Sequence, residues 1–198
     1  MNYKDYQRAR DTAWRLLLDC GVSRLPVDLN PICKQLGVKV FRYESVRGLP
    51  DVASKTDGLT FFHHGEPVIL YDQSKTLERI RFTVAHELGH LILGHVAPGQ
   101  QTTTNREPMP TDNPIETAAN QFAARLLAPA CVLWGLDLHT AEEIATLCRI
   151  SKQAAEFRAE RMALLYERGK FLTSPLEQQV YNQFAPFIQE FRYRSPEE

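Results

Sequence analysis

The sequence lacks an excess of charge of either sign, since its 198 residues include 23 Lys and Arg against 24 Asp and Glu. Proteins that bind nucleic acids or anionic membranes through their overall charge carry a surplus of basic residues. We therefore expect no direct nucleic-acid binding, and any polymeric partner would be met by a local patch. Long apolar runs are also missing, because stretches such as LLL at 16–18 fall far short of the roughly 20 residues of a transmembrane helix. We expect a soluble protein that does not associate with a membrane.

Cysteine is scarce and widely scattered. The chain has four cysteines, with neither a CxxC pair nor a compact disulfide framework. Residues 1–18 mix basic side chains with Asp5 and Asp11, and they lack the apolar core and small-residue cleavage site of a secretion signal. Both features predict a cytoplasmic protein with reduced, mostly buried thiols. The cysteines are Cys20, Cys33, Cys131 and Cys148.

The hydrophobic pattern has a helical period over most of the chain and is interrupted by three short β-branched and aromatic segments. These segments, at 38–43, 58–63 and 67–71, indicate strands, and HGE between the last two predicts a tight hairpin. We expect an α+β fold that is mostly helical, with a small three-stranded sheet packed beside the helix over 76–94. Helices are expected at 3–19, 30–37, 76–94, 114–128, 140–148, 151–168 and 176–191.

The length of the chain fits one domain with a smaller appendage. We predict a domain over residues 1–130 and a helical extension over residues 131–198 that packs on it. Within the extension, residues 140–168 resemble a helix-turn-helix. The polar, aperiodic segment 97–113 is either a lid or disordered.

The sequence RFTVAHELGHLILGH at 81–95 places three histidines and a glutamate in an apolar helix. His86 and His90 are four residues apart, so both imidazoles lie on one helix face and can bind one metal ion. A catalytic zinc site uses three protein ligands and leaves a position for water. Glu87 points about 100° away from His86 around the helix axis and is better placed to contact that water than to bind the ion. The alternative is a core helix whose histidines are satisfied locally, but burying these groups without an ion would be costly.

Glu116, in PIETAANQFAARLLAP at 114–129, is the best candidate for the third ligand. A carboxylate in the first turn of a helix beside the HELGH helix can reach the ion, and two histidines with one glutamate form an established catalytic zinc set. Glu116 could instead only close a capping box with Asn113. The spacing of His95 is one residue off the extended HExxHxxGxxH pattern, and we expect it to cap the helix C-terminus as a protonated ring. Glu107 and Asp112 are alternative carboxylates.

Further residues are candidates for supporting roles around the metal. Asn120 lies four residues after Glu116 on the same helix face and could hydrogen-bond a ligand. A donor for the oxyanion of the reaction is expected, and Tyr71, His63 and Arg125 are candidates between which nothing in the sequence selects. An edge of the small sheet offers unpaired backbone groups that could pair with an extended peptide.

The motifs HELGH and IETAANQFAARLLAP, preceded by GVSRLPVDLNPICKQLGVKVFRY, resemble the ImmA/IrrE metallopeptidases over roughly residues 10–130. The resemblance implies a zincin-like fold and one zinc ion held by His86, His90 and Glu116, with Glu87 as the catalytic base. Members of the family characteristically cut phage-type or stress-response transcriptional repressors. The resemblance therefore implies a zinc endopeptidase whose substrate and partner is a repressor protein.

Two functions of other classes stay open. The first is a DNA-binding regulator that uses residues 140–168, although Glu156, Glu160 and Glu167 are interleaved with the basic residues there. The second is a protein-binding regulator whose zinc is structural. A structural site is usually four-coordinate and rich in cysteine, and no cysteine neighbours the HELGH helix in sequence. The sequence predicts no particular oligomeric state.

Overall fold

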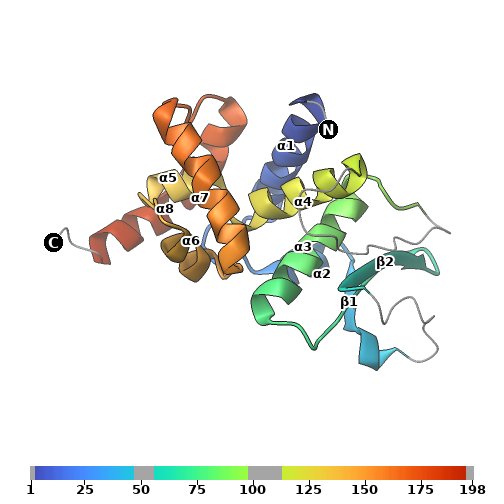
Figure 1. The fold of residues 1–198 in the computed structure, drawn as a ribbon. Helices are drawn as coiled ribbons and strands as arrows, with labels where there is room; N and C mark the ends of the chain where they lie inside the picture. Colours follow the sequence, from blue (N-terminus) through green and yellow to red (C-terminus); the bar gives the residue numbers. More distant parts are fainter. Residues whose placement is uncertain (1–2, 47–55, 98–112, 195–198) are drawn as a thin grey trace. The chain divides into compact units, whose positions relative to one another are not determined.

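The structure is a computed structural model that describes residues 3–46, 56–97 and 113–194 (Figure 1). Helices dominate, and three strands form a single sheet, which confirms the predicted α+β, zincin-like architecture. The helices are α1 (Tyr3–Asp19), α2 (Leu29–Gln35), η1 (Tyr43–Ser45, 3-10), α3 (Leu77–Ile92), α4 (Pro114–Leu127), α5 (Ala130–Gly135), α6 (Ala141–Cys148), α7 (Lys152–Glu167) and α8 (Pro175–Arg194). The strands are β1 (Lys39–Arg42), β2 (Gly58–His63) and β3 (Glu66–Tyr71).

The chain forms two compact units. The first comprises Met1–Thr12 and Leu29–Ala123, and the second comprises Ala13–Asp28 and Ala124–Glu198. The first unit therefore holds the sheet, α3 and the N-terminal part of α4. The boundary of a domain at residue 130 and the packing of 131–198 on that domain stay predictions, and most of the segment 97–113 lies outside the described residues.

The sheet has the strand order β1-β3-β2, with β1 parallel and β2 antiparallel to β3. His64 and Gly65 link β2 to β3 in left-handed backbone conformations, as a tight two-residue hairpin requires. Leu59 packs with Val68 and Leu70 on one face of the sheet. Thr60 and its partner Ile69 lie on the opposite face, because side chains alternate along a strand.

Helix α3 packs against β2 and β3 (Figure 1). The Thr76 side chain caps the start of this helix by accepting a hydrogen bond from the backbone amide of Arg79. Gly94, with a φ of 78°, ends it in the left-handed conformation that glycine tolerates best. The segment from Thr83 to His90 is buried throughout, so the HELGH motif lies in the interior of the first unit.

The helices differ from the expected ranges in two places. Helix α2 spans Leu29–Gln35 where 30–37 was expected, so Asn30 and Pro31 lie in its first turn. Helix α5 was not expected, because its six residues, ACVLWG, are too short to show a helical period between Pro129 and the next turn.

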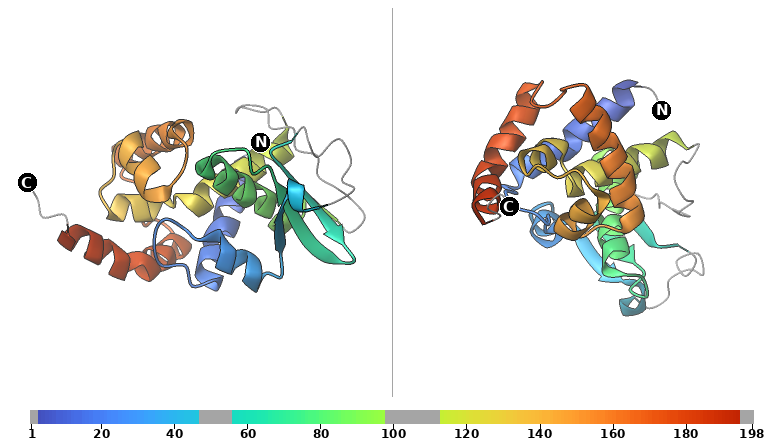
Figure 2. Two further views of the ribbon diagram at one scale, coloured as in Figure 1. Left: turned by 90° about the horizontal axis from the view of Figure 1, so that it is seen from below. Right: turned by 60° about the vertical axis from the view of Figure 1, so that its left-hand side comes forward.

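In the second unit, α5 packs against α8 and α6 against α7, and Figure 2 shows the α6 and α7 pair from two further sides. Thr140 and Glu143 form a capping box at the start of α6, and the side chain of Ser151 caps α7. The apolar stripe of α8 is buried, including Val180 and Phe184, so it packs inside this unit. Within the described part of the chain, every helix is too short or too polar to cross a membrane.

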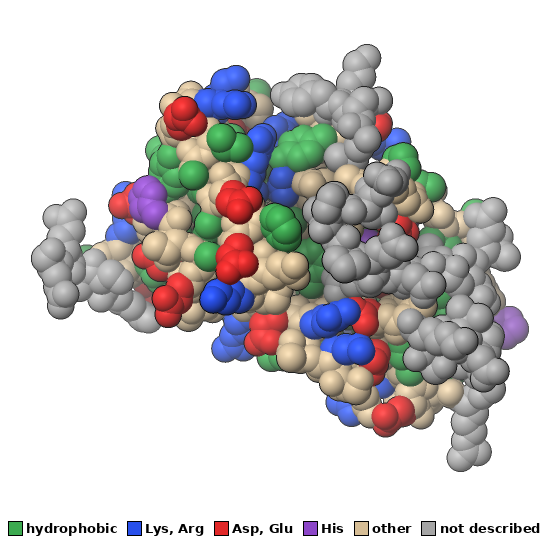
Figure 3. Space-filling model, viewed as in Figure 1, with side chains coloured by type: hydrophobic (Ala, Val, Ile, Leu, Met, Phe, Trp, Pro, Cys, Tyr) green, Lys and Arg blue, Asp and Glu red, His purple; other side chains and the backbone are tan. Residues whose placement is uncertain are grey.

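The helix-turn-helix resemblance of α6 and α7 is limited by where the basic side chains lie. Arg158 is buried, whereas Glu156 and Glu160 are exposed on the same helix. Acidic and basic side chains are mixed on the face of the molecule shown in Figure 3. The surface of α7 is therefore not a continuous basic stripe of the kind that follows a phosphate backbone.

Candidate metal centre

The centre is built on α3, where the chain buries three ionisable side chains in adjacent turns. His86, Glu87 and His90 expose 2%, 1% and 0% of their surfaces. Burial of polar groups at this level is unfavourable unless each of them is hydrogen-bonded, paired or bound to a metal. The contacts of these three side chains therefore decide what the centre can do.

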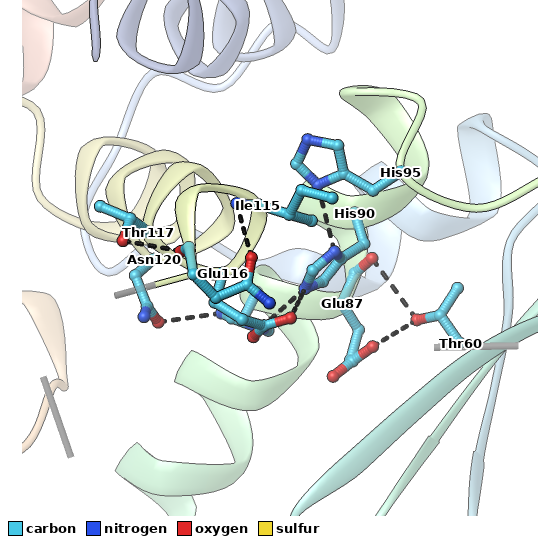
Figure 4. A network of polar contacts seen from close by, with 10 residues as sticks. Thr60, Glu87, His90, His95, Ile115, Glu116, Thr117 and Asn120 are labelled. Atoms are coloured by element: carbon cyan, nitrogen blue, oxygen red, sulfur yellow. Dashed lines mark hydrogen bonds and ion pairs between the residues drawn. The ribbon is translucent and has the colours of Figure 1, made fainter. Parts of the chain in front are cut away.

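Three ligand atoms from α3 and α4 converge on one point (Figure 4). His86 Nε2 lies 3.0 Å from His90 Nε2 and 3.2 Å from Glu116 Oε2, and His90 Nε2 lies 3.5 Å from Glu116 Oε1. Nitrogen and oxygen ligands about 2.0–2.1 Å from a tetrahedral zinc ion lie about 3.3–3.4 Å from one another. The observed separations therefore suit a shared small divalent cation.

The remaining ring nitrogens of the two histidines determine which atoms face inward. Asn120 Oδ1 lies 2.9 Å from His86 Nδ1, and an amide oxygen only accepts hydrogen bonds. His86 therefore carries its hydrogen on Nδ1 and presents the Nε2 lone pair to the centre. His90 Nδ1 lies 3.1 Å from His95 Nδ1, and a hydrogen donated from His90 in this contact leaves its Nε2 lone pair inward as well.

Glu116 supplies the negative charge of the centre. Its partial burial raises the pKa of the carboxyl, but without a metal ion an imidazole that carries a proton on Nε2 can donate to it, and such hydrogen bonds with His86 and His90 lower the pKa to about 2. The helix cap comes from Asn113, whose Oδ1 accepts the backbone amide of Ile115 at 3.0 Å. The Glu116 side chain is thus directed at the histidines and remains ionised at neutral pH.

His95 differs from the protonated cap that its position suggested. Burial and the neighbouring His90 lower its pKa to about 4, so the ring is neutral at physiological pH. The helix end is closed by the backbone of His95, whose amide donates to the carbonyl of His90 at 2.8 Å. The imidazole instead contacts the His90 ring, where it can accept a hydrogen bond and hold that ring in place.

The Glu87 side chain extends toward β2. Thr60 Oγ1 donates a 2.7 Å hydrogen bond to Glu87 Oε2 (Figure 4). Gly58 lies beside the same side chain, since a Cβ placed there would be 3.1 Å from Glu87 Cγ. Sequence reasoning missed Thr60 and Gly58. The signal was their alternation on one face of β2, but the pairing of that face with Glu87 is visible only in the fold.

The three candidate oxyanion donors have the following surroundings. The hydroxyl of Tyr71 lies 3.4 Å from Nε of Arg42 on β1, and His63 is exposed at the end of β2, with its ring against His64. Arg125 is buried in the last turn of α4, in the part that belongs to the second unit. A role of any of these three as the oxyanion donor stays a prediction. Glu107 and Asp112 lie outside the described residues.

Comparison with known proteins assigns the chain to a family. The model of the IrrE N-terminal-like domain, peptidase family M78, matches residues 33–160, well over half of the chain. The matched segment contains both histidines, Glu87 and Glu116. No curated protein matches the chain.

Proposed function

Because the chain belongs to the IrrE N-terminal-like family of metallopeptidases, we propose that it is a cytoplasmic zinc endopeptidase that cuts a transcriptional repressor at a defined site and so relieves repression. The observation that carries this proposal is the group of His86, His90 and Glu116, whose ligand atoms all lie within 4.8 Å of one another. All three residues belong to one compact unit.

The donor set favours zinc. Two neutral imidazole nitrogens and one carboxylate oxygen are the protein ligands of a common type of catalytic zinc site, and three protein ligands leave a coordination position open. A zinc ion, when bound, would supply Lewis acidity that polarises the substrate carbonyl and lowers the pKa of a water molecule. Asn120 and His95 would hold the two imidazoles in the tautomer and orientation that this role needs.

Glu87 is the proposed general base. Its carboxylate accepts a proton from water while the water oxygen forms a bond to the carbonyl carbon of the scissile peptide. The carbon–nitrogen bond then breaks, and Glu87 returns the proton to the departing amine nitrogen. A fixed orientation favours proton transfer, and the buried Glu87 carboxylate has Oε2 held by Thr60.

Strand β2 is the proposed place for the substrate backbone. Among the described strands it pairs only with β3, so its other side has backbone groups directed away from the sheet. An extended segment of a repressor could add there as a further strand, close to Glu87. The repressor as a substrate class rests on the family resemblance of the paired motifs.

The test uses the zinc-loaded protein, its Glu87→Gln variant and the repressor encoded beside its gene. Mass spectrometry of the products should find one defined cut with the wild type. Glu87→Gln should bind the same amount of zinc and yield no product, because the amide cannot accept the proton. An intact repressor after prolonged incubation with the zinc-loaded wild type would contradict the proposal.

A further inference from the structure

We infer that Thr60 is a positioning residue for Glu87, holding its carboxylate in the orientation that proton transfer requires. The inference rests on the proposed function, because it assigns Thr60 a share in the same reaction. It is carried by a contact between β2 and α3 that lies entirely within the first unit.

The contact is short and closed to solvent. The Thr60 side chain is fully buried, and its hydroxyl lies 2.7 Å from Glu87 Oε2 and 3.5 Å from the main-chain oxygen of Glu87. Hydrogen bonds to ionised acceptors are shorter and about twice as strong as neutral ones. A threonine side chain is also stiff, since its β-branch restricts χ1. The hydroxyl therefore fixes the rotation of the carboxylate plane.

The strand that carries Thr60 is itself tied to α3. Asp57, just before β2, accepts hydrogen bonds from Arg79 of α3 at 2.7 Å, and Lys75 lies 3.8 Å from the same carboxylate. Thr60 is paired with Ile69 of the central strand. The donor on β2 and the acceptor on α3 are thus held in one frame, which limits relative motion between them.

Gly58 completes this frame by its small size. A Cβ at this position would lie 2.4 Å from Thr83 Cγ2, 3.1 Å from Glu87 Cγ and 3.2 Å from Glu87 Oε1. Any side chain there would push β2 away from α3 or displace the glutamate. The glycine lets the strand approach closely enough for the Thr60 hydroxyl to reach the carboxylate.

The kinetic test compares Thr60→Val, which keeps the shape, with Thr60→Ser, which keeps the hydroxyl. With the repressor encoded beside the gene as substrate, Thr60→Val should lower kcat by roughly 10- to 100-fold at unchanged KM and zinc content, because a misplacement of a reacting group by about 1 Å can cost roughly 100-fold. Thr60→Ser should restore kcat to within a few-fold of wild type.

A second measurement does not depend on activity. In urea unfolding of the zinc-loaded protein, Thr60→Val should raise the unfolding equilibrium constant by roughly tenfold. The same substitution should raise it far less in a Glu87→Ala background, because the hydrogen bond is already lost there. A Thr60→Val enzyme with wild-type kcat, or additive effects on stability, would overturn the inference while leaving the proposed function intact. If the wild type cuts no repressor, the proposed function fails. The stability measurement then still tests the hydrogen bond between Thr60 and Glu87: coupled effects support it and additive effects contradict it.

Discussion

At the scale of single residues, the candidate metal centre brings together ligand atoms whose lone pairs repel one another. Two imidazole Nε2 atoms and a carboxylate lie 3.0–3.5 Å apart in a largely buried place. Neutral ring nitrogens with inward lone pairs gain nothing from each other at this distance, but each can coordinate a cation. The ionised Glu116 adds the charge that makes a divalent ion favourable.

Removing a ligand should have a different effect from removing the base. Loss of a residue that hydrogen-bonds a metal ligand typically lowers metal affinity by roughly 10- to 100-fold. Glu116→Ala removes a ligand itself, so it should lower zinc affinity by at least as much. Glu87→Gln should leave affinity unchanged, since Glu87 points toward Thr60. Competition with a chromogenic chelator measures both variants. Stoichiometric zinc of wild-type affinity in Glu116→Ala would show that another group is the third ligand.

Asn120 should affect the metal without contacting it. Its Oδ1 is 2.9 Å from His86 Nδ1, so Asn120→Ala removes the acceptor that selects the tautomer. We expect zinc affinity to fall by about 10- to 100-fold in this variant. Asn120→Asp is the matched control and should retain affinity, because a carboxylate also accepts from Nδ1. Equal affinities of the alanine variant and the wild type would rule out this orienting role.

At the scale of elements, one glycine sets how closely α3 and α4 approach. A Cβ on Gly89 would lie 2.9 Å from Cδ1 of Phe122, which is fully buried. Glycine within a helix costs about 1 kcal/mol relative to alanine, so close packing accounts for its presence better than helix formation does. This approach brings Glu116 on α4 within reach of the two histidines on α3.

The packing of Gly89 on Phe122 predicts a coupled pair of substitutions. Gly89→Ala should cost about 1–3 kcal/mol more in the wild type than in a Phe122→Leu background, because the smaller side chain leaves room for the new methyl group. Urea unfolding of the single and double variants measures the difference. Additive free energies of unfolding would mean that Gly89 does not set the spacing of the helices.

Sequence patterns predicted where the helices and strands lie, but they predicted the contacts between these elements less well. The four-residue spacing of His86 and His90 follows from helix geometry, and the helices and strands around it have clear periods and caps. Which carboxylate α4 turns toward the histidines depends on packing, and the capping-box alternative for Glu116 could not be dismissed from spacing alone. Thr60 and Gly58 were missed because a residue on a strand shows its partner on a helix only after the two elements pack.

At the scale of the whole molecule, charge and family membership are consistent with a protein substrate. The chain carries a net charge of −1, and the family match covers both metal-binding motifs. The second unit contributes α6 and α7, in which Arg158 is buried and acidic side chains are exposed. We propose no direct role in DNA binding for this pair of helices.

An electrophoretic mobility shift with the operator of the neighbouring repressor tests that proposal. The zinc-loaded protein alone should not shift the DNA at physiological salt, since the sequence has no surplus of basic residues and the described helix α7 has no continuous basic stripe. The repressor serves as the positive control. A shift by the peptidase alone that weakens steeply as salt is raised would establish direct phosphate contacts and favour a DNA-binding regulator.

The central claim is that one zinc ion is held between α3 and α4. Anomalous diffraction from crystals of the zinc-loaded protein, measured on both sides of the zinc absorption edge, locates the ion directly. A single anomalous peak within bonding distance of His86 Nε2, His90 Nε2 and a Glu116 oxygen is the predicted result. A protein that retains one equivalent of zinc but has its peak elsewhere, or whose Glu116 carboxylate turns away from the ion, would contradict the account.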